Sequence, residues 1–252
     1  MKMLTVMSLN CNCLSDKHGP WEKRAILMAD LIARIRPDII LFQAAALHPV
    51  RTNGIDQGSE IARMADYPYA VFEQSDCMPD RLVLGQTIIS KYPVTGVETL
   101  QLSPAPGIAD RTKRLVMKGE VLLNEGILYL YNAYFSWIAE QTRQNLEESL
   151  PFINKCDGMA LLMGDLNTPE MQVFEPLRKA GWKDVWILLK KETAGATFES
   201  HKPEIRIDYA WANEYLEKYV DTVETFNHQS EDGLIRMSDH LALMVTLTLN
   251  PS

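Results

Sequence analysis

Two polar side chains stand where an apolar run of the sequence ends, at a spacing that could serve hydrolysis. Asp165 and Asn167 follow the apolar run 160–163 and are separated by one residue. Alternate residues of an extended chain point to the same face, so both side chains would project together. The carboxylate could take a proton from an attacking water, and the amide could donate to a phosphate oxygen. The same residue types also fill ordinary turns at helix entries, so the pair alone leaves both interpretations open.

A histidine with nearby acids precedes the final apolar segment. Ser238, Asp239 and His240 are consecutive, and neighbours on a strand point to opposite faces, so Asp239 is not expected to orient His240. Asp208, in the segment 206–209, is the better partner, because a carboxylate bonded to imidazole fixes its tautomer and favours its charged form. A lone histidine at a strand edge is more often a structural residue. The pairing is therefore a hypothesis.

Two further polar segments close predicted strands. Asn10 ends the first apolar segment, and Asn132 and Tyr134 end another. The structural alternatives are a polar turn for the first and an amphipathic strand with a wet tyrosine hydroxyl for the second.

The elements that must position these side chains alternate between strands and helices. Apolar residues at helical spacing between Pro20 and Pro37 predict one helix, and Leu146, Leu150 and Ile153 predict a second. Thr168 is expected to cap a third helix, which ends at Gly181. Alternating or apolar runs predict strands over residues 3–10, 38–43, 84–90, 97–102, 115–123, 127–135, 159–164, 206–212, 219–226 and 240–249. This order predicts an α+β fold in one domain over residues 1–252, with sheets packed on each other.

Composition narrows the class of protein. Hydrophobic residues make up 46% and charged residues 23%, and no apolar run approaches the roughly 20 residues that cross a bilayer. Residues 1–10 alternate like a strand, so we expect no signal peptide and an intracellular, most simply cytoplasmic, protein. A net charge of −8 disfavours nonspecific binding of nucleic acid, although a bound metal ion can reverse the field in a cleft. The four cysteines lack paired spacing, which predicts reduced thiols.

Together and in order, the polar motifs resemble those of the endonuclease/exonuclease/phosphatase superfamily, whose fold is that of exonuclease III and deoxyribonuclease I. The resemblance spans nearly the whole chain. It implies a four-layer α/β sandwich, with two mainly antiparallel or mixed β-sheets face to face and helices outside. The matching segments are LN at 9–10, PDIILFQ at 37–43, GQTIISKYPV at 85–94, YNAYF at 131–135, GDLN at 164–167, RIDY at 206–209 and SDH at 238–240.

The resemblance implies a divalent-metal-dependent phosphoester hydrolase and assigns its parts. Asp165 would position or deprotonate the attacking water, and Asn167 would hold the scissile phosphate. His240, oriented by Asp208, would stabilise charge on the phosphoryl oxygens. The remaining assignments are catalytic Tyr134, substrate-phosphate contacts Asn132 and Arg114, and metal-site residues Asn10 and Asp239. Mg²⁺, or Mn²⁺ in its place, is the expected ion, because it takes oxygen ligands and bridges to phosphate.

Two departures from the family pattern bear on activity. The usual Gln-Glu reads Gln43-Ala44, so the principal metal ligand of the family is missing. Glu73 or Asp80 could approach from elsewhere, and the change could also mean natural loss of activity or an engineered inactive variant. The usual Asn-x-His reads Asn132-Ala133-Tyr134, as in the exonuclease III branch, whereas SKYPV at 90–94 and GATF at 195–198 are more similar to the small bacterial hydrolase branch. Gln86 stands where Asn is frequent.

Three functions follow from these features. The acidic surface favours a phosphoesterase acting on a small or lipid-like substrate. Tyr134 favours an exonuclease III-like DNA nuclease, for which Arg111, Lys113 and Arg114 form the one tight basic cluster near the motifs. Ala44 favours a degenerate member that binds a phosphorylated ligand or a protein partner without catalysis. The sequence does not distinguish monoesters from diesters, or identify a protein partner.

Overall fold

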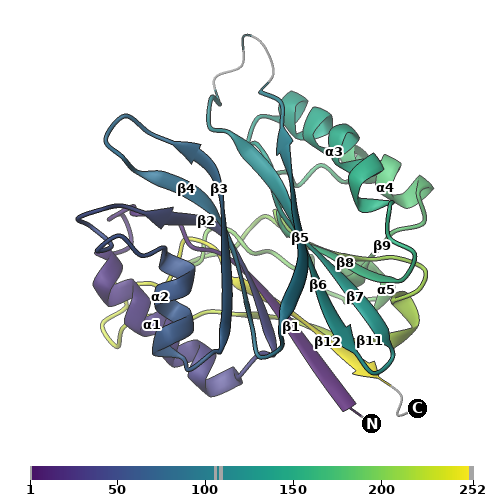
Figure 1. Cartoon of the computed structure of the whole chain (residues 1–252), viewed down its shortest axis with the longest axis horizontal. Coiled ribbons are helices and arrows are strands. Elements are labelled where there is room, and N and C mark those ends of the chain that lie inside the picture. Colours follow the sequence, from purple (N-terminus) through teal and green to yellow (C-terminus); the bar gives the residue numbers. More distant parts are fainter. Residues whose placement is uncertain (1, 105–106, 108–109, 250–252) are drawn as a thin grey trace.

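The computed structural model describes residues 2–104, 107 and 110–249. Within these residues, two six-stranded β-sheets lie face to face, and helices cover their outer faces (Figure 1). The predicted α/β sandwich is confirmed. No helix of the described residues is long and apolar enough to cross a membrane.

The first sheet contains the chain's N-terminal strands and its last two strands. Its order is β11-β12-β1-β2-β4-β3, and β1 pairs parallel with β2 but antiparallel with β12, so the sheet is mixed. The outer face is covered by α1 (Trp21–Ile35) and α2 (Gln57–Met64). The strands are β1 (Lys2–Asn10), β2 (Ile39–Leu47), β3 (Tyr69–Cys77), β4 (Val83–Ser90), β11 (Val220–Phe226) and β12 (Ala242–Leu249).

The second sheet has the order β5-β6-β7-β8-β10-β9, and β7 pairs parallel with β8. Its strands are β5 (Val94–Leu102), β6 (Arg114–Leu123), β7 (Gly126–Tyr134), β8 (Met159–Asp165), β9 (Lys183–Asp184) and β10 (Asp208–Ala212). On this side lie α3 (Ala139–Ile153), α4 (Glu175–Lys179), α5 (Val185–Leu188) and the 3₁₀ turns η1 (Met171–Phe174) and η2 (Glu217–Tyr219).

The central strands are buried on both faces, which explains their nearly continuous apolar sequences. In β1, Leu4 and Val6 face the core between the sheets, whereas Met7 and Leu9 pack in the cluster beneath α1 and α2. Leu161 and Met163 of β8 close the same central core from the other sheet. The candidate polar side chains lie near the ends of these strands.

Strand register lines up the ends that carry the candidate residues. Asp165 is paired with Tyr134 of β7 on one side and with Asp208 of β10 on the other. In the first sheet Asn10 is paired with Gln43. Because β1 and β8 are in contact across the sandwich, the polar ends of both sheets meet at one place.

The structure departs from the predicted elements in several places. β2 continues to Leu47 through a bulge between Phe42 and Ala45, because Ala44 adopts a positive φ of 49°. The third predicted helix does not begin at Thr168: the chain is extended there, and helical turns start at Met171. The sequence prediction also lacked α2 and β3, since α2 is only eight residues long and β3 is an edge strand of mixed polarity.

Candidate active site

Asp165 lies at the centre of the polar cluster and is almost completely buried, at the last position of β8. Asn10 Nδ2, from the end of β1, donates a hydrogen bond to Asp165 Oδ2 over 2.8 Å. The backbone N–H of Asn167 donates to Asp165 Oδ1 over 3.0 Å. The carboxylate therefore joins the two sheets, and three donors hold it in one orientation, since Asn167 Nδ2 also donates to Oδ2.

His240 is buried beside Asp165 and is bonded to the carboxylate predicted to orient it. Its Nδ1 lies 2.9 Å from Asp208 Oδ2, and its Nε2 lies 3.8 Å from Asp165 Oδ2. The ring of Phe198 packs on the imidazole at a centroid distance of 5.1 Å. Thr197 Oγ1 accepts the backbone N–H of Asp208 over 3.2 Å. In the sequence, Thr197 and Phe198 were identified only as part of a segment similar to one branch of the family, and their contacts with Asp208 and His240 were not predicted.

The charges of Asp165, Asp208 and His240 influence the pKa values within this cluster. Burial is the main cause that raises the pKa of Asp165, to about 7. Burial alone would lower the pKa of His240, but the charges of Asp208 and Asp165 and the hydrogen bond to Asp208 outweigh it and raise the pKa to about 10. A base that titrates near neutrality thus stands beside an imidazolium, which suits proton abstraction next to developing negative charge.

Arg114 and Tyr134 form a second part of the cluster. The guanidinium carbon of Arg114 lies 4.0 Å from the centroid of the Tyr134 ring, and Nη2 donates to Asp110 Oδ2 over 2.8 Å. Arg114 is 4% exposed, and its Nε and Nη1 have no hydrogen-bond partner among the described residues. A buried cation with free N–H groups is suited to bind an anion such as phosphate. Asp110, which also accepts from Ser136 Oγ, was missed because no sequence motif marks it.

Other predicted contacts are placed differently or already bonded. Asn132 is completely buried between the sheets, where it accepts from Gln43 Nε2 and donates to Phe42 O. Asn167 Nδ2 donates to Phe135 O and Asp165 Oδ2, so a phosphate oxygen must compete for these donors. In the basic cluster, the backbone N–H of Lys113 donates to Asp76 Oδ2, and Lys113 Nζ lies 3.9 Å from Asp76 Oδ1. Arg111 is exposed and forms no ion pair with the described residues.

The oxygen and nitrogen donors at the cluster fit a divalent cation only with a reduced ligand set. Among the described residues, donor atoms of Asp165, Asp208 and His240 lie within 4.8 Å of one another. Asp239 Oδ1 lies 4.0 Å from His240 Nε2, and Asn10 Oδ1 already accepts the N–H of Asn12. Three carboxylates and an amide oxygen are suitable ligands for Mg²⁺ or Mn²⁺. His240 does not count among them, because a pKa of about 10 keeps its imidazole protonated at neutral pH.

Position 44 borders this cluster but offers no ligand. Ala44 is buried, and its carbonyl accepts the N–H of Cys13, immediately after the Asn10 segment. Neither alternative acid predicted from the sequence replaces the missing carboxylate in the cluster of close donors. Asp80 is exposed in the turn after β3, and Glu73 lies opposite Gln86 in β3.

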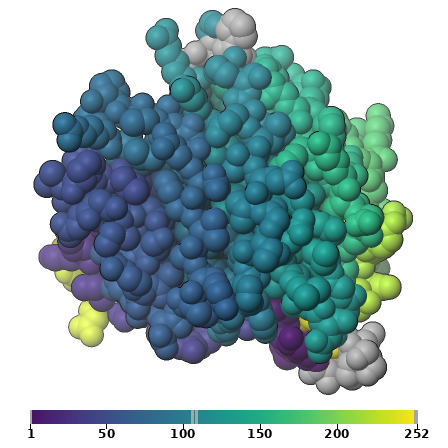
Figure 2. Space-filling view, viewed as in Figure 1, coloured from purple at the N-terminus to yellow at the C-terminus, as the bar shows by residue number. Residues whose placement is uncertain are grey.

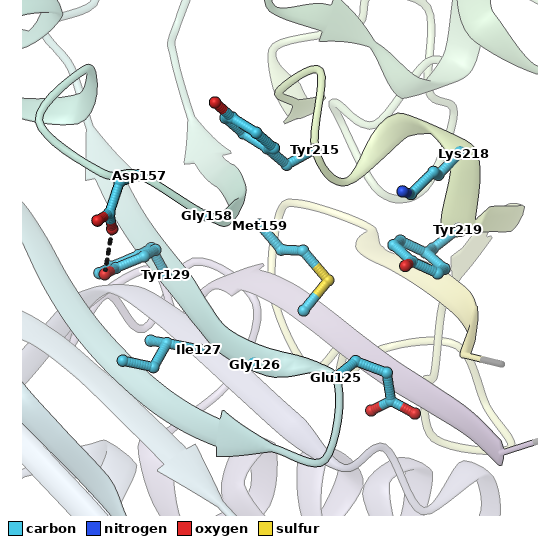
Figure 3. A pocket seen from close by; sticks show the side chains of 10 residues that line it. All are labelled: Glu125, Gly126, Ile127, Tyr129, Asp157, Gly158, Met159, Tyr215, Lys218 and Tyr219. Carbon is cyan, nitrogen blue, oxygen red and sulfur yellow. Dashed lines mark hydrogen bonds between the residues drawn. The ribbon is translucent and has the colours of Figure 1, made fainter. Parts of the chain in front are cut away.

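A hollow of about 350 Å³ lies at the opposite end of β8. Figure 3 shows Tyr129, Tyr215 and Tyr219 around Met159, with the Tyr129 hydroxyl bonded to Asp157. Met159 begins the strand that Asp165 ends, and the six residue steps between them span about 20 Å. This hollow is therefore remote from the polar cluster.

Comparisons with known proteins agree with this geometry. The sequence model of the endonuclease/exonuclease/phosphatase family matches residues 7–240. A family protein from Leptotrichia buccalis has a similar structure, with a TM-score of 0.77 and 16% identity over 98% of this chain and 100% of that chain. A D. rerio TDP2 humanized by 14 mutations gives a TM-score of 0.75 and 18% identity over 98% and 99%. TDP2 from Caenorhabditis elegans gives 0.74 and 16% over 98% and 75%. At such low identities the likeness concerns the fold alone. No curated protein sequence matches the chain.

Proposed function

The chain belongs to the endonuclease/exonuclease/phosphatase family, and on this basis we propose that it is a divalent-metal-dependent hydrolase of small or lipid-like phosphoesters. The family includes metal-dependent phosphodiesterases and nucleases. The observation that carries the proposal is the buried unit of Asp165, His240 and Asp208, with a partly unpaired arginine beside it.

In the proposed reaction, water attacks the phosphorus in line with the leaving oxygen. Asp165 accepts the proton of this water, and a pKa of about 7 makes the carboxylate available as a base at neutral pH. His240 donates from Nε2 to a phosphoryl oxygen, and Asp208 keeps the imidazole charged through Nδ1. Arg114 binds a second phosphoryl oxygen with its free N–H groups.

A divalent ion would supply further charge stabilisation and a more acidic bound water. Asn10 and Asp239 would hold Mg²⁺ or Mn²⁺, with Ala44 leaving one ligand fewer than the family pattern. We therefore expect slow turnover that depends on millimolar metal.

A small substrate is favoured over DNA by the surface near Arg114. Leu102, which pairs with Arg114, lines a groove of about 530 Å³ between β3 and the end of β5. In the space-filling view, the blue residues of the first sheet lie to the left of the green residues of the second-sheet side (Figure 2). Among the described residues that line this groove, Lys113 is the one cation, and the net charge of the chain is −8. The described lining therefore has no row of Lys and Arg of the kind that binds a phosphate backbone.

A DNA nuclease is the second candidate, because Tyr134 stacks on Arg114 within the site. The third candidate, a binding protein without catalysis, is supported by Ala44.

The test is hydrolysis of bis(4-nitrophenyl) phosphate, 4-nitrophenyl phosphate and abasic-site DNA with Mn²⁺, Mg²⁺ or EDTA. We expect metal-dependent release of 4-nitrophenol that falls about 100-fold or more in Asp165→Asn. Asp157→Asn, in the remote hollow, is the control and should retain the rate. Equal rates in Asp165→Asn and the unaltered chain would refute the assignment, and cleavage of abasic DNA alone would favour the nuclease.

A further inference from the structure

A second cluster of possible ligands surrounds Glu199, in the turn that precedes β10. Glu199 Oε1 lies 3.5 Å from His18 Nε2, and Oε2 lies 3.1 Å from His201 Nδ1. Lys17 Nζ also contacts Oε1. One carboxylate thus has two imidazole nitrogens close to its two oxygens, outside the catalytic unit described above.

His18 has a buried nitrogen that the protein leaves unsatisfied. The residue is 4% exposed, and its Nε2, although 3.5 Å from Glu199 Oε1, makes no hydrogen bond within the described part of the chain. A buried polar atom without a partner is costly unless a water or ligand satisfies it. Burial also lowers the pKa of His18, so the ring is neutral at pH 7 and can offer a lone pair. The nitrogen therefore has the state that a metal ion requires.

The two nitrogen–oxygen distances match those between ligands of one ion. Zinc–nitrogen and zinc–oxygen bonds of about 2.0–2.2 Å at a tetrahedral angle place neighbouring donors about 3.3–3.5 Å apart. The observed distances of 3.5 and 3.1 Å are close to this spacing. Ordinary hydrogen-bonded pairs also occur at 3.1 Å, so the orphaned His18 nitrogen is the observation that distinguishes a metal site.

We propose that His18, Glu199 and His201 bind a first-row transition-metal ion of the Zn²⁺ type at the rim of the catalytic cleft. Two imidazoles and one carboxylate suit Zn²⁺ better than Mg²⁺, which prefers oxygen ligands and retains its waters. The donor atoms of the three side chains do not all lie within 4.8 Å of one another, so binding of one ion requires His201 to turn inward. Its side chain is 49% exposed, which leaves it free to do so.

The ion would connect two loops that support the catalytic histidine. The N–H of Ser200 donates to Asp239 O, and Ser200 Oγ donates to Ser238 O. On the other loop, His18 O accepts the N–H of Arg236. Coordination by residues on either side of Ser200 therefore fixes the backbone next to His240. The ion acts as a structural clamp, and its effect on stability is independent of phosphoester hydrolysis.

Lys17 competes with the ion for Glu199. Its ammonium must leave Oε1 when the metal binds, and because its side chain is 63% exposed it can move into water. Removing this charge should strengthen metal binding, whereas removing a ligand should weaken it.

The experiment is calorimetric titration of the full chain with ZnCl₂ at pH 7.5, followed by thermal melts with and without Zn²⁺. His18→Ala and His201→Ala should each weaken Zn²⁺ binding about 100-fold or more, since loss of even a supporting contact to a ligand costs about 10–100-fold. Lys17→Met should tighten it, and MgCl₂ should not displace the ion. His228→Ala is the matched histidine control and should bind as the unaltered chain does.

Zn²⁺ should also raise the melting temperature of the unaltered chain and of Asp165→Asn, but not of His201→Ala. Because His201 is half exposed, its variant remains informative even if His18→Ala fails to fold. Absence of Zn²⁺ binding, or binding that His201→Ala leaves unchanged, would overturn the proposal. Binding lost in Asp165→Asn would place the ion in the catalytic cluster and would also overturn it.

Discussion

Replacing Asp208 by Asn tests how the site keeps His240 charged. Asp208 Oδ2 lies 2.9 Å from His240 Nδ1, and the substitution removes the charge while conserving the size of the side chain. The rise in the pKa of His240 from 6.5 to about 10 corresponds to roughly 5 kcal/mol in favour of the imidazolium. Asp208 is the largest of the contributions that raise this pKa, ahead of Asp165 and Asp239.

If Asp208 supplies about half of this energy, its loss lowers the pKa of His240 by about 2 pH units. The direction for stability follows from the same shift. A pKa raised by folding stabilises the protein fully below the unfolded value of 6.5, and this contribution is lost as the pH rises through about 10. The variant should therefore lose stability mainly at pH 6 and should show a flatter dependence of stability on pH.

The assay is the pH profile of kcat/KM with a phosphodiester and Mg²⁺ between pH 5.5 and 9.5. In the unaltered chain, activity should rise through about pH 7 as Asp165 loses its proton and then stay level. In Asp208→Asn, activity should fall again within this range, reaching a deficit of about 10-fold at pH 9, where about one tenth of the imidazole is still protonated. Asp184→Asn, which breaks the buried ion pair with Arg206, is the control, and its kcat/KM should stay level above about pH 7. A level profile for Asp208→Asn would refute our account of His240.

Two further substitutions separate binding from folding. Arg114→Met should lower kcat/KM about 10-fold to 100-fold. It should also destabilise the fold by about 3 kcal/mol, because Asp110 is left buried and unpaired. Adding Asp110→Asn should restore the stability measured in urea melts but not the rate of hydrolysis. Gly164→Ala should cost about 3 kcal/mol in the same melts, since its φ is +148° and a Cβ would lie 1.9 Å from Ala133 O. Gly158→Ala, whose nearest contact would be 3.3 Å, is the control and should cost less. Equal stability of the two glycine variants would contradict our conclusion that the backbones of β7 and β8 lie too close at Gly164 for a Cβ.

Much of the fold could be predicted because strong periodicity coincided with burial. The first helix was predicted between Pro20 and Pro37, and it spans Trp21–Ile35. The start of the third helix was wrong, because the side chain of Thr168 bonds the N–H of Glu170 in an extended segment rather than capping a helix. Short or edge elements such as α2 carry too few residues for a periodic signal.

The candidate site was predictable where a polar residue lies at one end of an apolar strand. Asp165 ends β8 and Asp208 begins β10, and strand register brings them side by side. The sequence does not reveal Asp110, whose place depends on a buried pair with Arg114. Nor does it reveal that Asn132 has its amide bonded between the sheets, because this depends on the distance across the sandwich.

Ala44 is the residue on which the central claim turns. Its backbone already adopts φ 49°, so Glu at this position adds no new conformational strain. The hydrogen bond from the N–H of Cys13 to Ala44 O places Ala44 beside the Asn10 segment. A carboxylate added at position 44 would therefore lie near the proposed metal position.

The most direct measurement is therefore phosphodiester hydrolysis by Ala44→Glu, with Ala44→Gln as the neutral control of equal size, at several Mg²⁺ and Mn²⁺ concentrations. We predict a metal-dependent gain of at least about 10-fold for Ala44→Glu alone, and its loss when Asp165→Asn is added. If neither the unaltered chain nor Ala44→Glu hydrolyses diesters, monoesters or abasic DNA, the proposed catalysis is contradicted.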